Sequence, residues 1–367
     1  MLVAPTAAEE LAGHLADANG KQQSITLGGQ STKHRMAGPL HDSDVTITTR
    51  CLNRVLQYDP RDLTISVEAG MPFAELSRIL AEHRQMIPLD PPFAGQATVG
   101  GIVAANVSGP RRRLYGAARD LVIGMTLATL EGKLIRTGGL VVKNVAGLDI
   151  AKLMIGSFGT LAAIAVVNFR LHPMPAATRT FVQQFDRIES AMAARNQVLQ
   201  SRLQPAAIDI LKSLNGYQLL VQAAGSLSVL DRYSRELPGA QIVEGAQEEA
   251  LWRTIREYTP EFLAKHENGA VVRVSCTLSD IGTVLESFPA SALARAGSGV
   301  CYGYFAEASS LRYPPVGTSV IEFAPPGFRC TQDLWPQPGT DFEMMKLIKQ
   351  MFDPHALLNR GRLYGRI

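Results

Sequence analysis

A glycine-rich turn near the N-terminus contains the first residues whose types and spacing could do chemistry. The turn follows a short run at residues 24–27 that has the composition of a strand. Consecutive backbone N–H groups in such a turn can surround an anion, and its hydroxyl and ammonium groups add donors. A pyrophosphate would suit such a turn, and a tight turn between two strands explains the same residues. The turn consists of Gly28, Gly29, Gln30, Ser31, Thr32 and Lys33.

Residues 90–120 form a second unusual segment, which is rich in glycine and apolar at the same time. Its glycines and prolines predict neither a regular helix nor a regular strand. Its valines, alanines and isoleucine are too apolar for an exposed loop, and a buried irregular segment must satisfy its own backbone groups. Small residues also let a backbone approach a ligand closely. Two interpretations stay open: a large polar cofactor lies along the segment, or the segment is a packing turn between buried strands.

Basic side chains near these glycines are candidates for contacts with a phosphate or a carboxylate. Arg111, Arg112 and Arg113 end the apolar segment, and Lys143 and Asn144 lie in another glycine-rich stretch. Guanidinium and ammonium groups bind such anions through charge-assisted hydrogen bonds. A solvated basic loop explains each set as well. We retain Arg111, Arg112 and Lys143 as candidate substrate-binding residues.

Several other catalytic and binding patterns are absent from the sequence. No G-x-G-x-x-G pattern lies between a predicted strand and a helix, and there is no Walker or G-x-S-x-G pattern. The seven histidines show no H-x-x-x-H spacing, and the four cysteines include no C-x-x-C pair. We therefore expect no metal site and no iron–sulfur cluster held by this chain alone. No residue is assigned as a catalytic base.

The composition describes a globular protein with a substantial core. The chain has 367 residues, of which 46% are hydrophobic and 19% charged, so two domains are expected. A net charge of +3 is too small to indicate a nucleic-acid partner. No apolar run has the length of a membrane span, and no basic segment precedes an apolar core at the N-terminus. A cytoplasmic location is the resulting expectation.

Apolar periodicity predicts the elements that position the glycine-rich segments. A helix is expected to begin at Pro72, because proline is favoured in the first helical turn. Glu131 and Gly132 indicate a hairpin turn between two strands. The first part of the chain is expected to contain helices at 6–19, 72–80 and 150–155 and strands at 24–27, 45–49, 63–67, 121–130, 133–136 and 161–171.

The sequence 172–175, His-Pro-Met-Pro, marks the expected domain boundary. Beyond it two similar sets of elements follow, and they predict an α+β domain whose largely antiparallel sheet is covered by helices on one face. A helix is expected at 339–352. The first set has strands at 181–185, 207–211 and 217–223 and helices at 188–203 and 227–237, and the second set has elements at 271–276, 281–288, 300–305 and 318–323.

Three motifs in order resemble the FAD-binding domain of the vanillyl-alcohol oxidase and p-cresol methylhydroxylase (PCMH) type. They are the turn at 28–33, the block 97–120 with its Thr-Val-Gly-Gly sequence, and Gly-Ser-Phe-Gly-Thr-Leu at 156–161. The sequence Asp-Pro-His-Ala-Leu-Leu-Asn at 353–359 resembles the family's C-terminal motif, with Arg360 in place of its proline. The resemblance implies an α+β protein with a two-part FAD-binding domain at 1–172, a smaller α+β cap domain at 176–338 with a mainly antiparallel sheet, and a C-terminal helix and tail at 339–367 that return to the FAD site.

A closer resemblance is to the FAD-binding (E) subunits of bacterial glycolate oxidases. It is carried by Pro91-Pro92, Ser108–Arg112, Tyr115-Gly116 and the sequence at 143–157. The resemblance implies oxidation of glycolate, a small 2-hydroxy acid, to glyoxylate in a complex with a larger FAD-binding subunit and an iron–sulfur subunit that receives the electrons. Such a complex can lie at the inner membrane although this chain has no span. A non-catalytic, FAD-holding subunit and a stand-alone FAD-dependent dehydrogenase stay open.

The same resemblance assigns residues to the cofactor. Non-covalent FAD is expected, because covalent members of the family use a histidine in or near the first turn, whereas this turn holds Gln30 and Ser31 and His34 lies beyond it. The second domain would cover the isoalloxazine ring. The implied cofactor-binding residues are Gly28, Gly29, Gln30, Ser31, Thr32, Lys33, Pro91, Ala97, Thr98, Val99, Gly100, Gly101, Ile102, Ser108, Gly109, Ile164 and Asn359.

Overall fold

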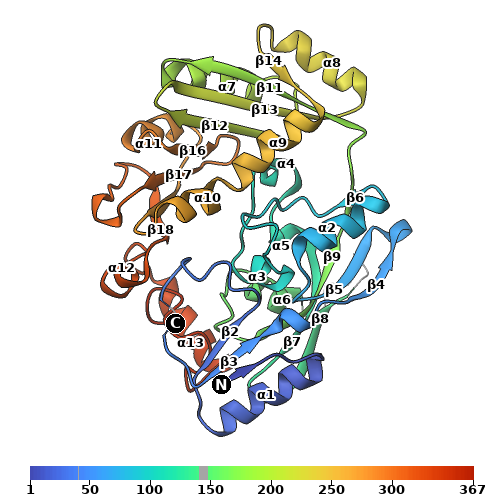
Figure 1. Cartoon of the computed structure of the whole chain (residues 1–367), viewed down its shortest axis with the longest axis vertical. Helices are drawn as coiled ribbons and strands as arrows, with labels where there is room; N and C mark the ends of the chain where they lie inside the picture. The colour runs from blue at the N-terminus through green and yellow to red at the C-terminus, as the bar shows by residue number, and fades with distance from the viewer. Residues whose placement is uncertain (40, 140–147) are drawn as a thin grey trace. The chain divides into compact units, whose positions relative to one another are not determined.

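The computed structural model of the chain describes residues 1–39, 41–139 and 148–367 (Figure 1). Its internal contacts divide the chain into two compact units. Unit 1 contains Met1–Val107, Ala117–Met174 and Gln337–Ile367, and unit 2 contains Ser108–Gly116 and Pro175–Pro336. Both units combine helices with sheets, so the fold class is α+β, as expected.

Unit 1 begins with a small parallel sheet of strand order β1-β3-β2. Its strands are β1 (Leu2–Val3), β2 (Ile25–Gly28) and β3 (Val45–Thr48). Ile25 lies opposite Val45 and Gly28 opposite Thr48, so the C-terminal ends of β2 and β3 lie side by side. The polar turn that follows β2 is thereby fixed next to the end of β3.

A five-stranded antiparallel sheet of order β4-β5-β9-β7-β8 forms the second part of unit 1. The hairpin expected around Gly132 is confirmed, since β7 and β8 pair antiparallel. A short antiparallel pair, β10 (His172–Pro173) with β6 (Gln85–Met86), lies apart from this sheet. The strands of the larger sheet are β4 (Val55–Asp59), β5 (Thr64–Glu68), β7 (Val122–Ala128), β8 (Leu134–Gly138) and β9 (Ala163–Arg170).

Helix α1 (Ala8–Gly20) joins the two sheets of unit 1 into one core. Its residues Leu11 and Leu15 are fully buried, and they share a hydrophobic cluster with Ile47 of the small sheet and Ala165 of the larger one. Burying a leucine side chain contributes about 1.5–3 kcal/mol. Helix α2 (Phe73–Glu82) begins directly after Pro72, as the proline predicts. Three short 3₁₀ turns, η1 (Thr49–Cys51), η2 (Pro60–Asp62) and, in unit 2, η3 (Ala308–Ser310), complete the connections.

Residues 90–120 contain short helices, so the prediction that this segment lacks helical structure was wrong. They are α3 (Val99–Ala104), α4 (Arg112–Tyr115) and α5 (Ala118–Leu121). The hydroxyl of Thr98 accepts a hydrogen bond from the N–H of Gly101 at 3.3 Å and caps α3. A Cβ atom on Gly100 would lie 2.7 Å from the Cβ of Ala69, so glycine lets the helix pack against the strand side of the core. Packing and capping therefore outweigh the low helix propensity of glycine.

The last segment of unit 1 is α13 (Asp341–Phe352) followed by a tail. The buried ammonium of Lys349 donates to the carboxylate of Asp353 at 2.6 Å and to the carbonyl of Thr160 at 2.7 Å. The Asp353 carboxylate also accepts from the N–H groups of Leu357 and Leu358. These bonds set the course of the tail, and Leu358 then forms a parallel bridge with Ile25 of β2. Helix α6 (Leu148–Met154) lies between β8 and β9 in the sequence.

Unit 2 is built on one eight-stranded antiparallel sheet of order β14-β11-β13-β12-β16-β17-β15-β18. The two expected sets of elements meet where β12 pairs with β16. Residues 108–116 pack with this unit although the sequence placed them in the first domain, and a Cβ on Gly297 would lie 2.4 Å from Cδ of Arg113. The strands are β11 (Ala177–Phe185), β12 (Ala207–Ser213), β13 (Gly216–Gly225), β14 (Gln241–Val243), β15 (Ala270–Ser275), β16 (Ala292–Arg295), β17 (Val300–Phe305) and β18 (Thr318–Phe323).

Helices lie on both faces of this sheet, which corrects the expectation of a single covered face. Residues of α7, α8 and α11 share the larger hydrophobic cluster with Phe181 and Val221. Trp252 and Ile255 of α9 pack instead against Val182, Leu220 and other residues that point to the opposite face. The helices of unit 2 outside 108–116 are α7 (Ile188–Gln200), α8 (Leu227–Glu236), α9 (Gly245–Arg256), α10 (Tyr258–Lys265), α11 (Ile281–Ser287) and α12 (Pro326–Thr331). None of the described helices is long and apolar enough to cross a membrane.

Candidate functional site

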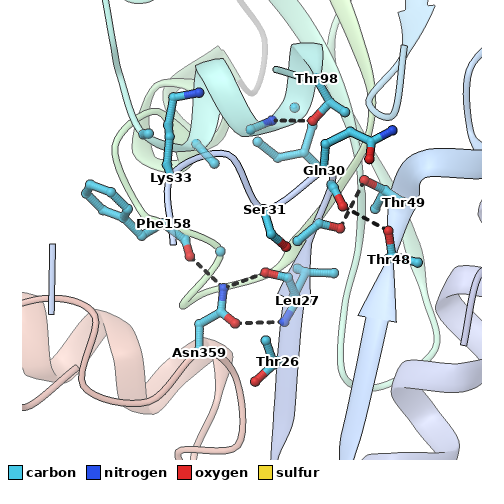
Figure 2. Close-up of a pocket in the computed structure, with 18 of the residues that line it drawn as sticks. Thr26, Leu27, Gln30, Ser31, Lys33, Thr48, Thr49, Thr98, Phe158 and Asn359 are labelled. Atoms are coloured by element: carbon cyan, nitrogen blue, oxygen red, sulfur yellow. Dashed lines mark hydrogen bonds between the residues drawn. The ribbon is translucent and has the colours of Figure 1, made fainter. Parts of the chain in front are cut away.

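A pocket opens in unit 1 where the turn after β2 lies against α3 and the C-terminal tail (Figure 2). It holds about 970 Å³ of empty space, part of it open to solvent. The walls come from segments far apart in the sequence, including the turn at 28–33, β3, α3, Phe158 and Asn359.

Two threonine hydroxyls hold the turn at 28–33 through its backbone carbonyls. The hydroxyl of Thr48 donates to the carbonyl of Gly29 at 2.9 Å, and the hydroxyl of Thr49 donates to the carbonyl of Gly28 at 3.4 Å (Figure 2). The N–H groups of residues 30–32 have no hydrogen-bond acceptor among the residues that the structure describes. Ser31 also has a positive φ of 53°, so the backbone curves at this point. Such a turn presents successive donors to an anion.

Gly29 and Thr98 bring the turn into contact with the start of α3. A Cβ atom on Gly29 would lie 2.2 Å from Oγ1 and 2.9 Å from Cγ2 of Thr98. Real Cβ atoms do not approach other atoms so closely, so glycine is required here for the two segments to meet. Thr98 itself is buried and caps α3, and it therefore cannot move away without cost.

Asn359 connects the C-terminal tail to two walls of the pocket. Its side-chain oxygen accepts from the N–H of Leu27 at 2.7 Å, and its amide nitrogen donates to the carbonyls of Leu27 and Phe158 at 3.0 and 2.7 Å (Figure 2). A Cβ on Gly159 would lie 2.8 Å from that nitrogen. The Asn359 amide thus fixes β2 and the loop at 158–159 in one arrangement.

The charged side chains that line the pocket are cationic. Lys33 is buried, with its ammonium 5.9 Å from the ring centroid of Phe93, and His34 is exposed nearby. The guanidinium of Arg362 donates to the carbonyl of Gly38 at 2.9 Å and lies over the ring of Phe158. No aspartate or glutamate is among the described lining residues. The electrostatic field of this lining favours an anionic ligand.

The residues that the sequence assigned to a cofactor fall into two groups. Residues 28–33, Thr98, Gly100, Gly101, Ile164 and Asn359 line the pocket. Pro91, Ala97, Val99 and Ile102 do not, and all four side chains are buried. Ser108 and Gly109 belong to unit 2 and are not part of this lining.

Other lining residues were not found from the sequence. Thr46 and Thr48 alternate along β3, and this period-two pattern is the signal that could have shown them. Arg362 and Phe158 had no such signal, because their places in the pocket depend on contacts between distant segments. The additional lining residues are Thr26, Leu27, His34, Thr46, Ile47, Thr48, Thr49, Ala104, Ala105, Phe158, Gly159, Ala162 and Arg362.

A second group of charged side chains lies on the sheet of unit 2. Arg295 forms an ion pair with the fully buried carboxylate of Asp209, and its guanidinium carbon is 5.9 Å from the ring centroid of Tyr302. Arg273 lies directly opposite Tyr302 in the β15–β17 pairing, and its Nε is 3.3 Å from Oε1 of Glu322. We call Asp209, Arg273, Arg295, Tyr302 and Glu322 the polar sheet cluster.

Burial and neighbouring charges tune the acids of this cluster. Burial raises the pKa of the Tyr302 phenol to about 12, although the positive charges of Arg295, Arg273 and Arg112 oppose the shift. Burial also raises the pKa of Glu322, against the attraction of Arg273. Arg112 therefore acts on this cluster. Lys143, the third predicted substrate residue, lies outside the described residues.

Two sequence-family models match parts of the chain. Residues 1–138 match the model described as FAD binding domain, and residues 337–363 match the model described as FAD linked oxidases, C-terminal domain. These two segments are similar to the two domains of FAD-linked oxidases. The two matched segments contain the turn at 28–33, α3 and Asn359, which together build the pocket. FAD is the cofactor of this family's domain, and the cationic lining and the open N–H groups suit its pyrophosphate.

Three proteins with similar sequences have names that refer to the oxidation of small hydroxy acids. The chain is 32% identical to glycolate oxidase subunit GlcE of Escherichia coli (strain K12), over 65% of each chain. It is 31% identical to glycolate oxidase subunit GlcD of Bacillus subtilis (strain 168), over 44% of this chain and 34% of that one. It is 28% identical to D-lactate dehydrogenase of Anaerostipes hadrus, over 66% of this chain and 50% of that one. The alignments thus span between about a third and two thirds of these relatives' lengths.

The chain also resembles solved structures of alkyldihydroxyacetonephosphate synthase. One of them matches with a TM-score of 0.71 at 17% identity, covering 98% of this chain and 76% of that one. Another matches with a TM-score of 0.69 at 19% identity and covers 75% of its own length. At this identity the likeness concerns the fold, which is the α+β fold of FAD-linked oxidases.

Proposed function

We propose that the chain is the FAD-binding subunit of a complex that oxidises glycolate, a 2-hydroxy acid, to glyoxylate. The observation that carries the proposal is the pocket of unit 1, whose charged lining is cationic and whose turn at 30–32 offers unpartnered N–H groups. The family match supports FAD as the ligand, and the names of the relatives GlcE and GlcD support glycolate and an assembly of subunits.

The proposed binding of FAD is non-covalent and uses residues already in place. The N–H groups at 30–32 would donate to the pyrophosphate, and Lys33 and Arg362 would offset its charge. Gly100 and Gly101 would let the cofactor lie close to α3, and Ile164 would supply apolar contact. FAD supplies a two-electron acceptor when bound, and the protein supplies binding and electrostatics.

The polar sheet cluster is the proposed site for the substrate carboxylate. The guanidinium groups of Arg273 and Arg295 are held by ion pairs in a partly buried region, where charge-assisted hydrogen bonds are strong. Arg112 adds positive charge near Tyr302. Glu322 is the candidate acceptor of the hydroxyl proton, because burial raises its pKa toward the range of a general base. Arg111 and Lys143 stay as further candidates from the sequence.

The proposed partners are a larger FAD-binding subunit and an iron–sulfur subunit that receives the electrons. The names of GlcE and GlcD as subunits of glycolate oxidase support the first of these partners. The proposed location is the cytoplasm, with any contact to the inner membrane made through the partner subunits.

Purified chain, alone and mixed with the larger subunit, tests this function. We expect a yellow protein that releases FAD on acid precipitation, and flavin absorbance that glycolate bleaches once the larger subunit is present. Bleaching without any partner would show that the chain is a stand-alone dehydrogenase and needs no complex. A chain that holds FAD but leaves glycolate oxidation unchanged when its polar sheet cluster is altered would be a structural subunit instead.

A further inference from the structure

Two cysteines of unit 2 lie near each other on the face of the sheet that α7, α8 and α11 cover. Cys301 is a buried residue of β17, and Cys276 lies one residue beyond the end of β15. The N–H of Cys276 donates to the carbonyl of Gly299 at 2.9 Å, so Cys276 sits diagonally across from Cys301 in the strand pairing. Their side chains therefore lie on the same face of the sheet. Cys276 is partly exposed, between the exposed residues Ser275 and Thr277.

A buried arginine faces this pair of thiols. Arg195 of α7 is 1% exposed, and one of its Nη atoms donates to the carbonyl of Leu278 at 2.6 Å and lies 3.5 Å from the sulfur of Met192. Its Nε has no hydrogen-bond partner among the described residues. The ionisable groups that act on its charge are the thiols of Cys276 and Cys301.

This arrangement gives the two thiols different reactivity. A buried guanidinium stays charged and is costly without a counter-ion, and a thiolate is the counter-ion within reach. The neighbouring Cys301 thiol and, to a smaller extent, the charge of Arg195 lower the pKa of Cys276, while burial and the nearby Asp280 oppose the shift. The neighbouring Cys276 thiol and burial raise the pKa of Cys301. Cys276 is also the more exposed of the two residues, so its thiol is the one that an oxidant reaches first.

We propose that Cys276 and Cys301 form a peroxide-reactive dithiol site, in which Cys276 is the attacking thiolate, Cys301 the resolving thiol and Arg195 the positioning residue. The site is independent of the FAD pocket and of the proposed substrate. The oxidant is a hydroperoxide, of which hydrogen peroxide is the simplest. Thiolate character and access are the two properties that make a cysteine sensitive to such oxidants.

The proposed reaction balances as follows. The Cys276 thiolate attacks one peroxide oxygen, the O–O bond breaks, and the leaving hydroxide takes a proton to become water. Cys276 is then a sulfenic acid. The sulfur of Cys301 attacks the sulfur of Cys276, the S–O bond breaks, and hydroxide leaves with the thiol proton as a second water. Two thiols are oxidised by two electrons in total, and one peroxide is reduced to two waters.

The position of Cys276 allows the disulfide to close. A disulfide requires Cβ atoms about 3.5–4.5 Å apart, which is shorter than the average diagonal separation in a sheet. Cys276 follows the last residue of β15, and residues 276–280 form no strand. A small shift of this segment therefore brings the two sulfurs together without breaking the β15–β17 pairing.

The test uses the full chain with Cys51→Ser and Cys330→Ser, because those two cysteines are exposed and would otherwise react. Hydrogen peroxide is added in equimolar amount, and thiols are counted and peptides identified by mass spectrometry under non-reducing conditions. We expect both remaining thiols to disappear into a Cys276–Cys301 peptide that dithiothreitol separates. In Cys301→Ser, a sulfenic-acid probe such as dimedone should label Cys276. Arg195→Met should slow the oxidation, because the thiolate loses a neighbouring positive charge, and Arg195→Lys should slow it less.

Two results would overturn the proposal. One is a Cys276 thiol that survives peroxide while Cys51 and Cys330 of the unaltered chain are oxidised. The other is a disulfide that forms mainly between chains. If Arg195→Met fails to fold, the alkylation rates of Cys276 and Cys51 are compared in the unaltered chain instead. A Cys276 rate no faster than the Cys51 rate contradicts an activated thiolate.

Discussion

The side-chain amide of Asn359 hydrogen-bonds both backbone groups of Leu27, with 2.7 Å between Leu27 N and Asn359 Oδ1 and 3.0 Å between Asn359 Nδ2 and Leu27 O. The two residues are 332 positions apart. The C-terminal tail therefore forms part of the wall that carries the turn at 28–33. Any ligand of that turn depends on the tail being in place.

Replacement of Asn359 by alanine should loosen the pocket and lower the free energy of unfolding by roughly 2–4 kcal/mol, because three partly buried backbone groups lose their partner. The measurement is urea unfolding with and without FAD. We expect the stabilisation by FAD to fall as well. Asn215→Ala in an exposed turn is the control and should change neither value. A variant as stable as the unaltered chain would contradict the role of Asn359.

Gly29→Ala should weaken FAD binding, because the new Cβ would lie 2.2 Å from Oγ1 of Thr98. Thr98→Ala removes Oγ1 and Cγ2 and leaves its own Cβ 3.1 Å away, so the double variant should recover part of the affinity. Titration of FAD into the apoprotein measures all three variants. Gly13→Ala is the control, since nothing lies within 4 Å of a Cβ there. Additive losses in the double variant would show that the contact between Gly29 and Thr98 is not the cause.

Only part of the pocket could be predicted from the sequence. The composition of the turn at 28–33 indicated an anion site, and the family resemblance of the ordered motifs predicted that Asn359 lies near the same cofactor. Arg362 and Phe158 could not be found in this way, because their cation–π contact joins segments about two hundred residues apart and depends on the paths of the tail and of the loop before β9. Helix α3 was missed because its cap and its packing on Ala69 outweigh its two glycines.

The polar sheet cluster shows a second limit. Arg273 and Tyr302 become neighbours only through the register of β15 and β17, and the sequence does not specify that register. The alternation that predicts each strand gives no partner for it. Helix α9 was not predicted from the sequence at all, and it covers the face opposite the main core.

Asp353→Ala should destabilise unit 1 by about 3–5 kcal/mol, because it leaves the buried ammonium of Lys349 without its counter-charge. It also removes the acceptor for the N–H groups of Leu357 and Leu358. The exposed pair Lys346–Glu343 on the same helix is a matched control, and Glu343→Ala should cost no more than about 1 kcal/mol. Thermal and urea unfolding measure both. Equal effects of the two substitutions would contradict the assignment.

Arg273→Gln should raise KM for glycolate in the assembled complex roughly ten- to hundredfold while the FAD content stays unchanged, because a charged hydrogen bond to the carboxylate is lost. Glu322→Gln should lower kcat more than it raises KM, as expected for a proton acceptor. Steady-state rates with a dye acceptor measure both. Arg136→Gln on β8 of unit 1 is the control. A change in FAD content without a change in KM would show that the cluster does not bind the substrate.

The central claim is that the pocket of unit 1 binds one FAD without a covalent bond. The direct measurement is the flavin-to-protein ratio of the purified chain and of Gly101→Arg, whose side chain would enter the pocket beside Thr98. Circular dichroism confirms that both are folded, and acid precipitation separates free from attached flavin. We predict one FAD per unaltered chain, all of it released by acid, and almost none in Gly101→Arg. A folded, unaltered chain that takes up no FAD, or a Gly101→Arg variant with full flavin content, would contradict the account.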